Sequence, residues 1–152
     1  MRTVAEIMDA DPVTVRPETD VEGVLRTLKE HELPGVPVVN EGGRLVGIVT
    51  DADLVMTDES GNVSLRHYIE LFGGVIFVES LRHYEERLRK AFAGNAADMM
   101  TEDPTTIGPD ATAQDAARLI SSSGHNRIPV VEHGRLVGVV TRIDVLQALA
   151  GE

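Results

Sequence analysis

Two stretches of the chain are nearly identical: residues 44–53 read RLVGIVTDAD, and residues 135–144 read RLVGVVTRID. The similarity extends outward from them in the same order, with 36–39 (VPVV) matching 128–131 (IPVV) and 11–17 (DPVTVRP) matching 103–109 (DPTTIGP). The offset is 92 positions at first (103 against 11) and 91 after one dropped glycine (135 against 44). This pattern indicates a duplicated supersecondary unit, of which neither copy can bury its apolar face alone.

Each copy reads as strand, helix, strand, strand and helix. The first copy is expected to begin with a strand at Val13–Val15 and a helix that starts at a Thr19–Glu22 capping box. The apolar face of this helix is expected to contain Val21, Val24, Leu25 and Leu28. Two strands, Val36–Val39 and Leu45–Val49, should then flank a turn at 40–43, and Thr50 should begin a short helix. In the second copy, Ala116, Ala117 and Ile120 predict the helix face, and residues 132–134 predict a tighter hairpin.

A different composition marks the segment between the copies. It holds every aromatic side chain of the chain, namely Tyr68, Phe72, Phe77, Tyr84 and Phe92. Leu81, Tyr84, Leu88 and Phe92 have helical spacing, which predicts an amphipathic helix packed on the core or on a second subunit. The expected organisation is therefore a first unit at 1–56, a helical connector at 57–95 and a second unit at 96–152, together forming one module.

The charge and composition exclude several classes of protein. Asp and Glu number 25 against 14 Lys and Arg, and the net charge of −11 argues against nucleic acid as the partner. The chain has no cysteine, which excludes disulfides and thiolate metal sites. The longest apolar run, near Leu71–Val78, is too short to cross a bilayer, so no membrane association and a cytoplasmic location are expected.

The ordered motifs D-P-x-T, h-P-V-V and R-L-V-G-h-V-T-x-x-D, used twice, resemble a tandem pair of CBS domains, named after cystathionine β-synthase. The resemblance covers about 5–56 and 97–149. It implies an α/β fold in which two β-α-β-β-α units pack through their sheets about a pseudo-twofold axis. It also implies adenosine-containing ligands in clefts between the units, a regulatory role without catalysis, a protein partner that receives the signal, and pairing into homodimers.

The resemblance further implies two crosswise clefts. One is expected to contain Asp144, Thr141, Ile143, Met8, Val13, Leu33, Pro34 and Gly35; the other is expected to contain Asp53, Thr50, Ala52, Met100, Thr105 and the backbone of His125, Asn126 and Arg127. In such a cleft the aspartate accepts the ribose hydroxyls, and the threonine adds a further hydrogen bond. Aliphatic walls and main-chain groups would hold the adenine, since neither copy contains an aromatic residue.

A structural alternative stands beside each of these assignments. Thr141 and Asp144, like Thr50 and Asp53, have the spacing of a helix capping box, which needs no ligand. Met8, Val13 and Met100 fit plain core packing, and Arg142 fits a solvated charge at a helix end. The duplication at matching positions, together with the resemblance, favours the ligand-binding interpretation.

The two clefts are expected to differ. The Asp144 cleft has the side chains of Asn126, Arg127 and Arg142, and arginine grips phosphate oxygens in a bidentate way. The other cleft has Pro34, Gly35 and Asp51 at the matching positions, and an acid there repels phosphate. The sequence therefore predicts AMP, ADP or ATP in the Asp144 cleft. The second cleft would be weak, empty or suited to an uncharged adenosyl group such as that of S-adenosylmethionine.

Other chemistry is not indicated. The chain has neither a phosphate-binding G-x-x-x-x-G-K-[ST] loop nor a G-x-S-x-G motif, and no catalytic residues are predicted. Short D-x-D pairs are common at turns, so no dedicated metal site is expected, although a polyphosphate could carry Mg²⁺ with it. Two alternatives stay open: a scaffold or dimerisation module whose clefts have lost their ligand, and a sensor of S-adenosylmethionine or NAD.

Overall fold

The computed structural model describes residues 2–50 and 94–151, which form two compact units. Unit 1 comprises Met1–Thr14, Val39–Gly47 and Glu102–Glu152, and unit 2 comprises Val15–Val38 and Ile48–Thr101. The helix expected after Thr50, with Asp51, Ala52 and Asp53, and nearly all of the aromatic connector lie outside the described residues. Within the described ranges no helix combines the length and apolarity that a bilayer span requires.

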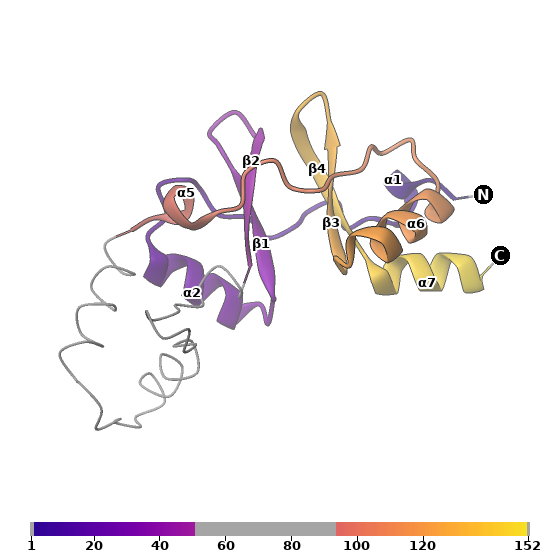
Figure 1. The fold of residues 1–152 in the computed structure, drawn as a ribbon, viewed down its shortest axis with the longest axis horizontal. Coiled ribbons are helices and arrows are strands. Elements are labelled where there is room, and N and C mark those ends of the chain that lie inside the picture. Colours follow the sequence, from indigo (N-terminus) through magenta and orange to yellow (C-terminus); the bar gives the residue numbers. More distant parts are fainter. Residues whose placement is uncertain (1, 51–93, 152) are drawn as a thin grey trace, which may run out of the picture. The chain divides into compact units, whose positions relative to one another are not determined.

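Unit 1 is built on an antiparallel hairpin. Its elements are α1 (Val4–Ile7), α6 (Ala113–Ser123), β3 (Arg127–Glu132), β4 (Arg135–Thr141) and α7 (Arg142–Ala150) (Figure 1). The turn residues His133 and Gly134 both have left-handed backbones, with φ of 53° and 80°, as a two-residue hairpin that follows the sheet twist requires. The tight hairpin predicted from residues 132–134 is therefore confirmed. Helices α6 and α7 pack against each other, and α7 also packs on β4.

The core of unit 1 is aliphatic and small. Its buried members are Val4, Ala116, Ile128, Val130, Val140 and Val145. Ala117 and Ile120 pack against this cluster while half-buried, so the predicted apolar face of α6 is confirmed. Because α1 supplies Val4, the N-terminal segment of the first repeat completes the core of the second repeat.

Unit 2 contains α2 (Val21–Glu30), α5 (Ala96–Met99) and parts of two paired strands, β1 (Gly35–Val39) and β2 (Leu45–Thr50). Val39 and the first half of β2 are assigned to unit 1. Asn40 Oδ1 accepts hydrogen bonds from the backbone N–H groups of Gly42 and Arg44, both at 3.0 Å, which confirms the predicted turn. The predicted α2 face is also confirmed, since Val21, Val24 and Leu28 are buried.

Two expectations for this part of the chain were wrong. The N-cap of α2 is Asp20, whose Oδ1 accepts from Gly23 N at 2.7 Å, whereas the Thr19 hydroxyl accepts from Arg16 N at 3.0 Å. Asp competes well with Thr as a helix cap, and the helix therefore starts one residue later than predicted. The strand expected at Val13–Val15 is reduced to a single bridge between Val15 and Val38, because the flanking prolines lack the N–H that a longer ladder needs.

The duplication seen in the sequence recurs in the backbone pairing. Three isolated bridges of unit 1, namely Thr3–Thr112, Asp9–Val139 and Ile107–Val130, have counterparts in unit 2 at the repeat offset. These counterparts are Asn95–Asp20, Thr101–Ile48 and Val15–Val38. The hydrogen bond from Val4 N to Ala111 O is 2.7 Å, and its counterpart from Ala96 N to Thr19 O is 2.8 Å. Each unit therefore combines the leading segment of one repeat with the body of the other. The mixed α/β class and the duplication are confirmed.

Candidate functional site

The first turn of α7 carries the residues that the sequence singled out most strongly. Thr141 is the N-cap, and its Oγ1 accepts a hydrogen bond from Asp144 N at 3.2 Å. In return, Asp144 Oδ2 accepts from Thr141 N at 2.9 Å, which completes a capping box. The other carboxylate oxygen, Oδ1, accepts no hydrogen bond from the described part of the chain. Asp144 thus uses one carboxylate oxygen in the capping box, and its Oδ1 can accept a hydrogen bond from another donor.

The same box occurs at two other helix starts. Asn95 and Asp98 form it at α5, and Thr112 and Asp115 form it at α6. The backbone hydrogen bond from Thr112, followed by that from its hydroxyl, lowers the pKa of Asp115, whose Oδ1 also lies 3.0 Å from Arg118. Cap geometry alone therefore does not distinguish Asp144. Burial does, because Asp144 is half-buried whereas Asp98 and Asp115 are exposed.

Arg127 lies across the hairpin from this helix start. It is the register partner of Thr141 at the end of the β3–β4 ladder, and it is half-buried. Directly opposed residues of an antiparallel pair project to the same face, with Cβ atoms about 5 Å apart. The topology therefore places a cation on the same face as the Thr141 side chain, beside the capping box.

Met8 is held against β4. The backbone of Asp9 exchanges two hydrogen bonds with Val139, both 2.9 Å. A Cβ on Gly138 would meet Met8 Sδ at 2.5 Å and Asp9 O at 2.7 Å, so only glycine fits beneath this segment. Met8 also packs on the unit 1 core while half-buried. The structure thus brings Met8 to the strand that leads into Thr141, as a packing residue at the edge of the candidate site.

The remaining unit 1 candidates are less closely tied to Asp144. Val13 and Thr105 are half-buried, and His125 is exposed with its N–H donating to Ser123 Oγ at 3.2 Å. In the described ranges, none of these three forms a hydrogen bond with Thr141 or Asp144.

Five further candidates belong to unit 2. Leu33, Thr50 and Met100 are half-buried, Pro34 is exposed and Gly35 is buried. A Cβ on Gly35 would lie 2.9 Å from Val49 O, so this glycine is required by the close approach of β2. The second repeat has Arg127, which is half-buried, at the matching position. Asp53 and Ala52 lie outside the described residues.

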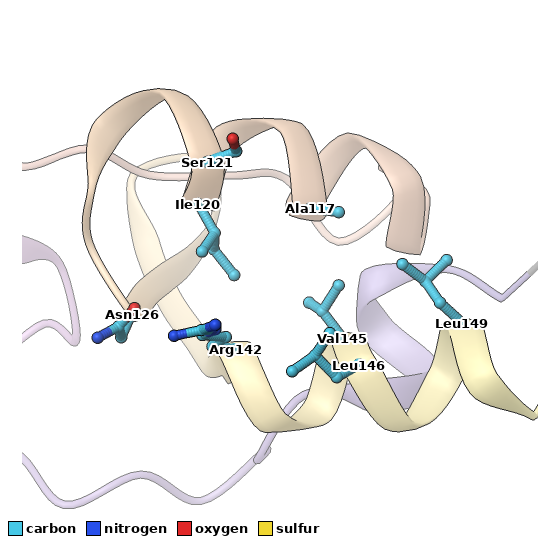
Figure 2. A pocket seen from close by; sticks show the side chains of 8 residues that line it. All are labelled: Ala117, Ile120, Ser121, Asn126, Arg142, Val145, Leu146 and Leu149. Atoms are coloured by element: carbon cyan, nitrogen blue, oxygen red, sulfur yellow. The ribbon is translucent and has the colours of Figure 1, made fainter.

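Arg142 and Asn126 lie in a groove between α6 and α7, with a volume of about 310 Å³ (Figure 2). Its lining residues are Ala117, Ile120, Ser121, Asn126, Arg142, Val145, Leu146 and Leu149. Arg142 N donates to Asn126 O at 2.8 Å, which joins the two residues at one end of the groove. Arg142 and Asp144 are two residues apart on a helix, so their side chains point to different sides. Sequence reasoning missed this groove, although Arg142, Val145, Leu146 and Leu149 have the i, i+3, i+4, i+7 spacing of a helix face.

Two other findings bear on the chemistry. Ile143, expected to contribute its backbone to a ligand, has a side chain that is 63% exposed. Over residues 2–50 and 94–151, no cluster of His, Asp and Glu has the composition of a metal site.

Comparison with known proteins identifies relatives that match this chain over most of its length. The chain is 33% identical over 144 residues to the protein MJ1426 of Methanocaldococcus jannaschii, covering 91% of this chain and 86% of the relative. It is 32% identical over 136 residues to the chloroplastic CBS domain-containing protein CBSX2 of Arabidopsis thaliana, covering 88% of this chain and 57% of the relative. The crystal structure of CBSX2 in complex with AMP superposes with a TM-score of 0.73 at 28% identity, covering 99% of this chain and 98% of that one.

The family comparison covers both halves of the duplication. The CBS domain model matches residues 4–59 and again 96–151, and these segments include both R-L-V-G-h-V-T-x-x-D motifs. The chain therefore belongs to the CBS domain family and carries two copies of that domain.

Proposed function

We propose that this chain is a regulatory module that binds an adenosine-containing nucleotide, with Asp144 accepting hydrogen bonds from the ribose hydroxyls. The observation that carries the proposal is the half-buried carboxylate whose Oδ1 has no donor within the described part of the chain. A ribose supplies two adjacent hydroxyl donors to such a group. Support for the ligand class comes from CBSX2, which is 28% identical and has been crystallised with AMP.

Arg127 is the preferred partner for a phosphate. It shares a hairpin face with Thr141, and a guanidinium can donate two parallel hydrogen bonds to phosphate oxygens. Arg142 lines the groove between the helices, on a different side of α7 from Asp144. We therefore assign the phosphate contact to Arg127 and not to Arg142. Mg²⁺ would bind only together with a polyphosphate.

The two aspartates of the T-x-x-D motifs are proposed to differ in their ligands. The site of Asp53 has Gly35 where the other has Arg127, and Asp51 where the other has Arg142. Calorimetry with AMP on Asp144→Ala and Asp53→Ala tests this difference. We expect AMP affinity to fall strongly in Asp144→Ala and little in Asp53→Ala, and an equal loss in both would show that the sites are equivalent.

A thermal-shift series with AMP, ADP, ATP, S-adenosylmethionine and NAD tests the ligand class. Free ligand at about 100 times its Kd stabilises the folded state by about 2.7 kcal/mol, and the Tm rises accordingly. We expect a rise with at least one adenine nucleotide. No rise with any of the five at millimolar concentration would overturn the proposal.

One observation favours a scaffold module as the second candidate. The Thr141–Asp144 box has the same hydrogen-bond pattern as the boxes at Asn95 and Thr112, which need no ligand. In a scaffold, the clefts would be empty and the chain would act only by assembly, for which a homodimer stays a prediction. In a sensor, the ligand must bind two conformations with different affinity to pass a signal to a partner protein.

A further inference from the structure

The nucleotide proposal leaves unused a pair of arginines at the tips of the two hairpins. Arg44 directly precedes β2 and Arg135 begins β4, and both residues are exposed. An isolated antiparallel bridge joins them within unit 1. They are also equivalent positions of the duplication, separated by the repeat offset of 91 (135 against 44). The cation of one repeat is therefore opposed by the same cation of the other repeat.

The hydrogen bonds around this bridge show how close the two residues lie. Leu45 N donates to Gly134 O at 3.1 Å, and Leu136 N donates to Gly43 O at 3.0 Å. These bonds flank the two arginines, which therefore form a non-hydrogen-bonded pair. At such positions of an antiparallel ladder the Cα atoms are about 4.5 Å apart and the side chains share one face. Like charges placed directly opposite each other in this way destabilise the pairing of the strands.

Gly134 brings the Arg44 side chain further toward its opposite number. A Cβ on Gly134 would lie 2.8 Å from the guanidinium carbon Cζ of Arg44 and would overlap Nη2. The guanidinium group of Arg44 is therefore placed over the backbone of the β3–β4 turn, immediately before Arg135. Glycine is needed at this position for the left-handed backbone of the turn and also for this contact.

The carboxylates near the two tips do not neutralise the pair. Glu132 is the register partner of Arg135, but it lies on β3, on the other side of β4 from Arg44. Glu41 lies in the turn before Arg44. Within the described part of the chain, neither arginine takes part in an ion pair. An anion bound from solution would offset the repulsion between the two guanidinium groups.

We propose that Arg44 and Arg135 together form a binding site for a phosphate-type dianion. A guanidinium group donates two parallel hydrogen bonds to phosphate oxygens, and a phosphate has enough oxygens and charge to accept such a pair from two arginines. Inorganic phosphate and the phosphoryl group of a larger molecule share this chemistry. The inference goes beyond the proposed function, because Arg127 lies at the opposite end of β3, about 17 Å from the turn along the strand.

Calorimetry on the full chain tests the site, with inorganic phosphate and pyrophosphate as ligands at constant ionic strength and mildly alkaline pH. We expect both anions to bind saturably to wild type. Arg44→Gln and Arg135→Gln should each weaken this binding at least about tenfold, because each removes a charged pair of donors. Arg118→Gln is the matched control, since Arg118 is an exposed arginine that is paired with Asp115, and it should leave the affinity unchanged.

Two further titrations separate this site from the proposed nucleotide site. Arg44→Gln should leave AMP affinity unchanged, whereas Arg127→Gln should weaken AMP and retain pyrophosphate binding at the hairpin tips. Pyrophosphate binding that persists in a chain unable to bind AMP would therefore still support the proposal. Loss of AMP and pyrophosphate binding together in Arg127→Gln, with no effect of Arg44→Gln, would overturn it.

A double-mutant cycle on the Tm at low ionic strength provides a second measurement. In chloride, Arg44→Gln and Arg135→Gln should each raise the Tm by about 1–2 °C, and the double variant by less than their sum, because either change alone removes the repulsion. In phosphate at the same ionic strength, each variant should be less stable than wild type. The proposal fails if neither anion binds to wild type, if all variants bind with equal affinity, or if the cycle is the same in both salts.

Discussion

Replacement of Gly138 by alanine tests the exchange of the N-terminal segment between repeats. The new Cβ would lie 2.5 Å from Met8 Sδ, 2.9 Å from Met8 Cγ and 2.7 Å from Asp9 O. The side chain of Met8 can move aside, but the carbonyl cannot, because Asp9 is fixed to Val139 by two backbone hydrogen bonds of 2.9 Å. Gly138→Ala must therefore either break this pairing or push the strand away.

The cost of Gly138→Ala follows from those contacts. Two backbone hydrogen bonds contribute about 0.5–1.5 kcal/mol each, and overpacking costs about 1–3 kcal/mol. Because breaking the pairing and moving the strand are alternatives that each cost about 1–3 kcal/mol, we expect the free energy of unfolding to fall by about 1–3 kcal/mol in urea titrations. For a chain of this length each kcal/mol lowers the Tm by about 2–4 °C. The double variant with Met8→Ala should recover only the side-chain part, since the contact with Asp9 O remains.

Gly108→Ala provides the control. No atom lies within 4 Å of a Cβ at Gly108, and its backbone is not left-handed, so its stability should stay within about 0.5 kcal/mol of wild type. If Gly138→Ala were as stable as Gly108→Ala, the segment that contains Met8 would not pack on β4, and the placement of Met8 beside the candidate site would be wrong.

Two further predictions concern the capping boxes. Thr141→Ala and Thr112→Ala remove equivalent N-caps, and each should lower the free energy of unfolding by about 0.5–2 kcal/mol. Only Thr141→Ala should also weaken AMP binding. Equal effects of the two substitutions on AMP binding would argue against a ligand role for Thr141. The Thr112 backbone hydrogen bond is the main cause that lowers the pKa of Asp115 in the folded state. The ionised carboxylate of Asp115 therefore stabilises the fold fully above the ordinary pKa of aspartate. This stabilisation is lost as the pH falls through the lowered pKa. The stability difference between wild type and Asp115→Ala should therefore shrink in acid, and a difference that is constant with pH would contradict this.

Much of the fold could be predicted because its signals are local or repeated. The duplicated R-L-V-G stretch fixes the correspondence between the halves, and the turn at 40–43 follows from residues with a strong conformational preference. The start of α2 was misplaced because Thr19 and Asp20 are both good caps, and only the fold decides between them. The pairing of Asp9 with Val139 was not foreseen, since it joins segments that are distant in sequence and share no motif.

In the candidate site, too, part of the arrangement could be predicted from the sequence and part could not. The motif T-x-x-D correctly located a capping box at Thr141 and Asp144, but it could not show that Asp144 is half-buried and the equivalent Asp115 exposed. The sequence predicted that both Arg127 and Arg142 contact the phosphate. The register of β3 and β4 puts Arg127 opposite Thr141, and Arg142 lines the groove between α6 and α7, a difference that the sequence did not indicate.

The most direct measurement is calorimetric AMP binding to wild type, Asp144→Ala and Asp115→Ala. Both variants break a capping box of the same pattern, so they share the structural cost, and only the first removes the half-buried carboxylate with an unused oxygen. Hydrogen bonds to a charged acceptor contribute about 1.5–3 kcal/mol each. AMP affinity should therefore fall at least about tenfold in Asp144→Ala and stay unchanged in Asp115→Ala. Equal affinity in all three proteins would contradict the role of Asp144 in ribose binding.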